Sequence, residues 1–311
     1  TSAAANYLFT PTGLATDGTK LIVADTNNNR VLIWNTVPTV NGTSADVVVG
    51  QSTFTGRTPN FGATIRDNSL ALPRGISVSG TRLVVADTSN SRVLVWNTIP
   101  TADAASADVV IGQSAFTDGV QNRGAQVPAA ATLAFPEGGF LTGTSLYVAD
   151  TGNNRVLTFD LTQSGDLQAT FVVGQLSFVT VNPTLTTPAS ATTLYTPVSV
   201  FEFPGGPVVI ASQAEHRVLA YAAPPAANTP AAAKAVGQLN FTDTAPNRST
   251  ESIAIPSEPG GAFFDITVVP DFNQPTKWRL ELGEANVPAK EAIDRYLVSR
   301  VRTSDSGVLD T

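Results

Sequence analysis

One short segment occurs four times at regular intervals, and this repeat restricts the fold more than any other feature of the chain. The copies read VADTNNNRVLIW (23–34), VADTSNSRVLVW (85–96), VADTGNNRVLTF (148–159) and, more divergent, IASQAEHRVLAY (210–221). A Gly-Gln pair follows each copy and a proline precedes it, both at a spacing of 61 to 63 residues between units. A constant period in several independent landmarks is typical of a repeat architecture.

Each unit contains four short apolar segments separated by turn-forming residues. In the first unit they read GLATD, KLIVAD, RVLIWN and ADVVVG, and a polar linker leads to the next proline. Short β-branched runs bounded by Gly, Asn, Pro and Thr are typical of strands. Four strands per unit, repeated along the chain, predict an all-β fold, a β-propeller of four-stranded antiparallel blades. The first strand of each unit should be the innermost one.

The repeat also predicts the domain organisation. Residues 1–255 contain four regular blades with long linkers, and residues 256–311 form a degenerate fifth blade or a C-terminal closing or assembly segment. Strands are expected in GGAFFDITVVPD (260–271) and TKWRLELGEAN (276–286), and a short helix in PAKEAIDRYLV (288–298), whose end could equally be a strand. We therefore expect five blades, with six as the rival count.

The polar part of the repeated segment is interpreted as the turn of a hairpin. Its aspartate can accept hydrogen bonds from backbone N–H groups two residues further on, as in an Asx-turn. The arginine that follows can reach this carboxylate or a neighbouring blade. The alternative is a ring of arginines that faces an anionic ligand, but a catalytic centre is needed once per ring and this pattern recurs. The residues concerned are Asp25, Arg30, Asp87, Arg92, Asp150, Arg155 and Arg217.

Composition excludes several classes of function. The net charge is −7, from 18 basic and 25 acidic residues, so the basic surface required for nucleic-acid binding is missing. No apolar run approaches the length that spans a bilayer, so membrane insertion is not expected. The chain has no cysteine and therefore no disulfide or thiolate chemistry. Few charged residues and many Thr, Ser, Asn and Gly favour an extracellular or cell-envelope location, with which the sequons at Asn41, Asn240 and Asn247 are compatible.

The VADTxNNRVL core of the hairpin resembles the NHL-repeat β-propellers. The resemblance extends from residue 5 to about residue 241, and the ADVVVGQSTFT extension looks like a longer variety found in bacterial secreted and cell-surface proteins. It implies a propeller that serves as an interaction platform for proteins, RNA or glycans. A minority of related propellers are metal-dependent lactonases or lyases.

Catalytic chemistry has few candidate residues. A metal-dependent hydrolase would need carboxylates on the inner strands, which contribute only Asp17 and Glu202. A structural Ca²⁺ site could be built on Asp17, but the sequence does not indicate one, and no cofactor is expected. His216 is the single histidine and lies in a turn, so it is interpreted as a solvated polar residue.

Binding residues are expected in the linkers, because long loops on a rigid scaffold often carry recognition. The candidates are Arg57, Asn60, Arg66, Asn122, Arg123 and, outside the repeat, Trp278. Trp34 and Trp96 recur at one strand position and are expected to pack between blades. The leading hypothesis is a non-enzymatic scaffold that binds a protein or a glycan through loops on one face. The alternatives are a structural subunit that self-assembles, as a homo-oligomer or filament, through its C-terminal segment, and a lactonase- or lyase-like enzyme.

Overall fold

The computed structural model describes residues 3–180, 188–203 and 206–246, and two C-terminal strands at 266–270 and 278–282. The chain separates into two compact units, Thr1–Ala254 and Ile255–Thr311. Within the described residues, no helix is long and apolar enough to cross a membrane.

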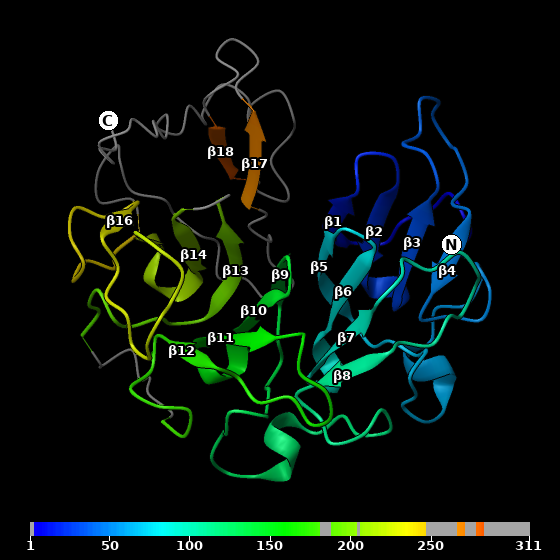
Figure 1. Ribbon diagram of the computed structural model, residues 1–311. Helices are drawn as coiled ribbons and strands as arrows, with labels where there is room; N and C mark the ends of the chain where they lie inside the picture. Colours follow the sequence, from blue (N-terminus) through cyan, green and yellow to red (C-terminus); the bar gives the residue numbers. More distant parts are fainter. Residues whose placement is uncertain (1–2, 181–187, 204–205, 247–265, 271–277, 283–311) are drawn as a thin grey trace. The chain divides into compact units, whose positions relative to one another are not determined.

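The first unit contains four antiparallel sheets of four strands, and the strands of each sheet lie in chain order (Figure 1). This confirms the predicted all-β fold of four-stranded repeats. The strands of the first two sheets are β1 (Pro11–Thr16), β2 (Leu21–Asp25), β3 (Arg30–Trp34), β4 (Val47–Val49), β5 (Pro73–Ser79), β6 (Arg82–Asp87), β7 (Arg92–Trp96) and β8 (Val109–Ile111). Those of the third and fourth sheets are β9 (Gly138–Thr142), β10 (Ser145–Asp150), β11 (Arg155–Asp160), β12 (Phe171–Val173), β13 (Pro197–Glu202), β14 (Val208–Ser212), β15 (Arg217–Tyr221) and β16 (Lys234–Val236).

The hairpin between the second and third strands of every sheet has the same geometry. One turn of 3₁₀ helix connects the strands, at η1 (Thr26–Asn28), η3 (Thr88–Asn90), η5 (Thr151–Asn153) and η6 (Gln213–Glu215). The residue after each turn is left-handed, with φ between 48° and 54° at Asn29, Ser91, Asn154 and His216. Asparagine tolerates this conformation better than most residues, so the Asn-rich turns suit the hairpin. Two further 3₁₀ segments, η2 (Pro59–Gly62) and η4 (Gln121–Gly124), lie in the linkers.

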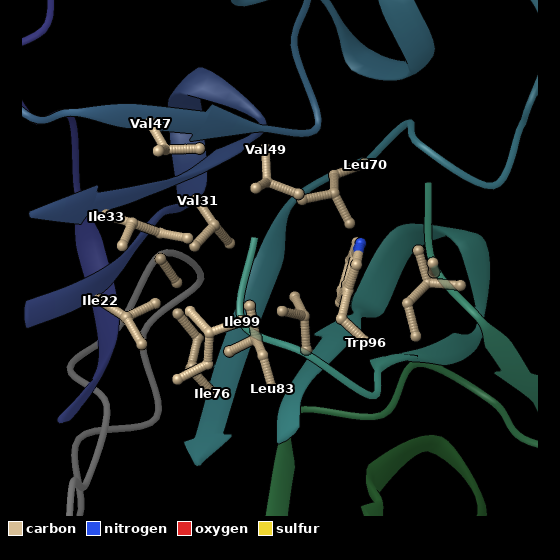
Figure 2. Packing of buried hydrophobic residues seen from close by; sticks show 14 residues of the cluster. Ile22, Val31, Ile33, Val47, Val49, Leu70, Ile76, Leu83, Trp96 and Ile99 are labelled. Carbon is tan, nitrogen blue, oxygen red and sulfur yellow. The ribbon is translucent and has the colours of Figure 1, made fainter. Parts of the chain in front are cut away.

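Consecutive sheets pack face to face. The first strands β1, β5, β9 and β13 contact one another in this order. Between the first two sheets, Ile22, Ile33 and Val47 of one pack with Ile76 and Ile99 of the other (Figure 2). Because both faces of a middle sheet are covered, its central strands are apolar throughout rather than alternating.

The glycine of the repeated Gly-Gln pair is required by this packing. Gly50 has a φ of 86°, and a Cβ atom there would lie 2.5 Å from Cδ1 of Leu70. Gly112 with Leu133, and Gly174 with Leu194, repeat the arrangement. The leucine that ends each linker thus fills the space that a side chain on the preceding sheet would occupy.

Both repeated tryptophans are buried, but only Trp96 packs between two sheets as expected. Trp96 belongs to the apolar cluster between the first two sheets, whereas Trp34 packs with Val23, Leu32 and Ala45 of its own sheet. Each indole Nε1 donates to a backbone oxygen nine residues ahead, that of Thr43 or Ala105. The buried polar edge of the ring is therefore satisfied.

In the second unit, β17 (Ile266–Pro270) and β18 (Trp278–Leu282) form an antiparallel pair, with Ile266 opposite Leu282 and Pro270 opposite Trp278. Both strands were predicted from the sequence. The helix predicted at 288–298 lies outside the described residues.

Candidate binding face at the hairpin end of the sheets

Neighbouring strands run in opposite directions in each sheet of the first unit. The starts of the first and third strands and the ends of the second and fourth strands therefore lie at the same edge. We call this edge the hairpin end. A buried ion pair lies at the centre of three of these edges. Arg30 Nε is 2.7 Å from Asp25 Oδ2, and both side chains are 0% exposed. Arg92 with Asp87, and Arg155 with Asp150, have the same distance and burial.

The arginines also bind the linkers on either side of the hairpin. Nη2 of Arg30 donates to the backbone oxygens of Ala4 (2.9 Å) and Tyr7 (2.8 Å), and Nη1 donates to that of Phe54. Arg92, Arg155 and Arg217 repeat these bonds with the equivalent linker residues. A guanidinium that is buried and saturated in this way presents no surface to an external anion.

The aspartates do not form the Asx-turns expected from the sequence. Asp25 Oδ1 accepts instead from the N–H of Phe9, 16 residues earlier in the chain, and Asp87 and Asp150 accept from the linker amides of Ala71 and Ala134. The turn itself is closed by a backbone bond from Asn29 N to Thr26 O, so the carboxylate is available for the linker. Burial raises the pKa of Asp87 and Asp150, and the guanidinium of the paired arginine opposes this shift.

The fourth hairpin obtains its carboxylate from a different position. Ser212 replaces the aspartate, and Glu215 Oε2 accepts from Ser212 Oγ (2.6 Å) and from Arg217 Nη2 (2.8 Å). Ser212 Oγ also accepts the linker bond, from the N–H of Tyr195. Sequence reasoning missed Glu215, although a comparison of the copies contains the signal: the acid lost at position 212 reappears three residues later, where Asn28, Asn90 and Asn153 stand in the other hairpins.

Two further side chains connect the hairpin to its surroundings. Gln51 Nε2 donates to the backbone oxygens of Asn29 and Thr58, both at 2.9 Å, which explains the glutamine of the Gly-Gln pair. Thr26 Oγ1 donates to Pro73 O of the next sheet at 2.7 Å. Thr88 and Thr151 bind Pro136 and Pro197 in the same way. The repeated segment is therefore a junction between sheets, linker and hairpin.

Two of the predicted binding residues participate in this junction. Asn60 and Asn90 exchange side-chain hydrogen bonds of 3.1 and 2.9 Å, and Asn122 and Asn153 exchange bonds of 3.0 and 2.9 Å. Each pair joins a linker to the hairpin of the following sheet. The structure thus brings both linker asparagines against the hairpins rather than into a common site with the arginines.

The predicted arginines lie in three different environments. Arg123 makes two bonds to the Asp166 carboxylate and a third to Gly112 O. Arg66 is exposed, and its backbone oxygen accepts from Arg92. Arg57 is exposed, and its backbone oxygen accepts from Asn29 Nδ2. The side chain of Trp278 lies outside the described residues.

Exposed apolar side chains gather in the linkers at the hairpin end. Leu176 and Leu239 directly follow the glutamines of the Gly-Gln pairs, and Phe135 lies three residues before β9. The backbone oxygen of Val120 accepts a hydrogen bond from Gln113 Nε2. Val179 directly follows Phe178, whose backbone oxygen accepts from Arg155 Nη1. After Val40, every exposed large apolar residue of the described chain is in a linker: Val120, Val127, Phe135, Leu176, Val179 and Leu239. We call this set the linker apolar residues.

The described residues contain no group of three or more His, Cys, Asp or Glu side chains that could hold a metal ion. Asp17 Oδ1 accepts from the N–H groups of Thr19 and Lys20, which lower the pKa of its carboxyl. Glu202 is hydrogen-bonded to Tyr147. His216 occupies the left-handed position of the fourth hairpin, where partial burial lowers the pKa of its imidazole.

Four-stranded antiparallel sheets packed in chain order through their first strands define a β-propeller-like fold. Comparison with protein-family models gives no match, and comparison with curated proteins gives none either. Among solved structures, the chain is similar to Kuenenia stuttgartiensis hydrazine synthase (TM-score 0.46, 12% identity, 91% of this chain and 58% of that chain). It is also similar to Myxococcus xanthus glutaminyl cyclase (TM-score 0.43, 11% identity, 91% of this chain and 94% of that chain).

Proposed function

We propose that this protein is a non-enzymatic scaffold of the NHL-repeat type, with five blades, that binds a protein partner at the hairpin end of its sheets. We place it outside the cell or in the cell envelope. The observation that carries the proposal is the position of the linker apolar residues, because aliphatic groups left in water at one edge of a rigid fold are typical of interaction surfaces.

The hairpin junctions support this proposal through their rigidity. The buried arginines hold the linkers at both ends, as in Arg155 with Ala129 O and Phe178 O. Side chains on a preorganised loop lose little conformational entropy when a partner binds. Val, Leu and Phe dominate the exposed set, whereas stacking on sugars usually employs Trp and Tyr. A protein is therefore favoured over a glycan as the partner.

The test compares the wild-type chain with the triple variant Leu176→Asp/Val179→Asp/Leu239→Asp. Peptides are selected from a displayed random library on the immobilised wild-type protein, and the affinity of each is then measured for both proteins. We expect the selected peptides to lose at least about tenfold in affinity for the variant, because a charge placed in an apolar contact costs more than 1.4 kcal/mol.

Lys20→Glu, which changes the exposed turn between β1 and β2 at the opposite edge, is the matched control and should keep the wild-type affinity. Peptides that bind the triple variant as well as the wild type would contradict the proposal. Binding on a glycan array in place of the peptides would favour the glycan alternative.

A further inference from the structure

A loop of the second sheet closes the free edge of the outer strand of the first sheet. Val48 lies in the middle of β4, opposite Leu32 of β3. Asp103 Oδ1 accepts from Val48 N, and Ala104 N donates to Val48 O, both at 2.9 Å. We call this pair of hydrogen bonds the edge clasp. It gives an outer strand the two partners that a further strand would otherwise supply.

The same clasp closes β12 between the third and fourth sheets. Asn228 Oδ1 accepts from Val172 N at 3.1 Å, and Thr229 N donates to Val172 O at 2.9 Å. In both clasps the residue after the Asp or Asn has a positive φ, 52° at Ala104 and 56° at Thr229. Val48 and Val172 are both fully buried. The clasp therefore consists of an Asp or Asn oxygen and the N–H of a following left-handed residue.

The outer strand of the second sheet, β8, has no clasp in the described part of the chain (Figure 1). Val110 lies opposite Leu94 in the register in which Val48 lies opposite Leu32, so its N–H and C=O also face the free edge. Among the described residues, neither group has a hydrogen-bond partner. The residue is accordingly only half-buried.

The loop next to β8 differs from the clasp loops. Residues 160–170 of the third sheet form a loop that is one residue shorter than its counterparts in the second and fourth sheets. Its Asp166 binds Arg123 of the linker through both carboxylate oxygens, and Arg123 Nε donates to Gly112 O at 3.3 Å. This contact lies beyond the end of β8 and leaves Val110 open.

The open edge is small. The strand β8 has three residues, Val109–Ile111. Alternate residues of an antiparallel strand direct their backbone groups to the same side, so within β8 only Val110 presents both groups at the free edge. Such a short edge does not template a long strand, but it matches a clasp of two bonds. It belongs to the first unit, between two described sheets, so it does not depend on the number of blades.

We infer that the β8 edge docks a loop of a partner protein that carries Asp-Gly or Asn-Gly. The Asp or Asn oxygen accepts from Val110 N and the glycine N–H donates to Val110 O, as Asp103 and Ala104 do at Val48. Glycine is favoured at the second position because it adopts a positive φ without steric cost. The chemistry of the partner follows from the molecule itself, because its own loops occupy the equivalent edges of β4 and β12. This inference does not depend on the proposed partner at the hairpin end.

The experiment uses a cyclic peptide that copies the clasp loop. The peptide PTADGASA contains residues 100–107 with glycine in place of Ala104, and it is titrated into the full chain while backbone amide signals are followed by NMR. We expect the Val110 amide signal to shift. The control peptide PTAAGASA, which lacks the carboxylate, should bind about tenfold more weakly or worse. In the free protein, the Val110 amide should exchange its hydrogen at least about tenfold faster than those of Val48 and Val172.

Two variants test the backbone contact. Val110→Pro removes the N–H, and proline is tolerated on edge strands, so the affinity for PTADGASA should fall about tenfold or more. Val110→Thr is the matched control, because it keeps the N–H and the β-branched shape and should bind as the wild type does. Leu176→Asp should also leave the peptide affinity unchanged, since it alters only the hairpin end. If Val110→Pro does not fold, the titration and the exchange rates of the wild type decide.

Three results would overturn the inference. The first is equal binding of both peptides, or no shift of the Val110 signal. The second is a Val110 amide as protected in the free monomer as that of Val48, which would assign the edge to another segment of the same chain. The third is protection of Val110 that rises with protein concentration, which would assign the edge to a second copy.

Discussion

Glu215 Oε2 lies 2.8 Å from Nη2 of Arg217, and this pair replaces the aspartate–arginine pair of the other three hairpins. The arginine makes the same bonds to linker oxygens in all four copies, whereas the carboxylate is supplied from two different positions of the turn. What the hairpin requires is therefore one buried anion beside the guanidinium, and not an acid at one place in the sequence.

Moving the carboxylate from position 215 to position 212 tests this requirement. Glu215→Gln should lower the free energy of unfolding by about 3–5 kcal/mol, because it leaves a buried guanidinium without its counter-charge. The double variant Ser212→Asp/Glu215→Asn recreates the third hairpin and should recover most of the loss. Urea denaturation followed by circular dichroism measures both. If the double variant is no more stable than Glu215→Gln, the claim that the carboxylate can come from either position is wrong.

Comparing Gly50→Ala with Gly18→Ala separates the cost of backbone strain from the cost of steric overlap. Its Cβ would overlap Leu70, and φ is 86°, so we expect a loss of about 2–4 kcal/mol. Gly18 has a similar φ of 93°, but a Cβ there meets nothing within 4 Å. Gly18→Ala should therefore cost only the strain, about 1–2 kcal/mol. Equal losses in thermal or urea unfolding would mean that packing against Leu70 contributes nothing.

Asn122 should contribute to stability through its amide pair with Asn153. Asn122→Ala leaves the buried Oδ1 of Asn153 without its donor, while Asn153 Nδ2 keeps its bond to Asp150, and should cost about 1–3 kcal/mol. A double-mutant cycle with Asn153→Ala, evaluated from urea midpoints, should give a favourable coupling energy. A coupling energy of zero would return Asn122 to the set of residues available for external ligands.

The Arg123–Asp166 pair should make a pH-dependent contribution. Hydrogen bonds from Arg123 lower the pKa of the Asp166 carboxyl in the folded state. The stabilisation is therefore complete above the pKa of an unfolded aspartate and is lost as the pH falls through the lower folded value. Because Asp166 is half exposed, Asp166→Asn should cost only about 0.2–1 kcal/mol at neutral pH.

Unfolding curves of Asp166→Asn and wild type, recorded from neutral to acidic pH, should converge at the acidic end. Asp118→Asn is the control, because the Asp118 side chain is exposed and forms no ion pair with the residues that the structure describes. A difference between Asp166→Asn and wild type that grows with falling pH would contradict the assigned sign.

Much of the fold could be predicted because local rules and the repeat agree. Apolar β-branched runs between turn-forming residues predicted the four strands of each unit, and the spacing of Arg30, Arg92, Arg155 and Arg217 predicted that the units are equivalent. The two C-terminal strands were predicted in the same way. The number of blades could not be derived from periodicity alone, because the last repeat has lost its landmarks.

The candidate site was less predictable. Asn60, Asn122 and Arg123 were chosen as polar residues on long linkers, and the structure engages each of them with another part of the chain. Their partners Asn90, Asn153 and Asp166 lie 30 to 43 residues away in the sequence. A residue pattern read along one segment contains no information about such pairings.

The sequence by itself determined the strands, the turns and their repetition, because these depend on side-chain periodicity and on residues that tolerate left-handed backbone. Only the tertiary structure decided which polar groups satisfy one another and which apolar groups remain in water. Leu8 and Leu70 occupy the same position of the repeat, yet Leu8 is exposed and Leu70 is buried. The physical reason is that burial depends on the sheet that packs against a residue: the described first sheet packs against Leu70, and among the described residues no other sheet packs against Leu8 in the same way.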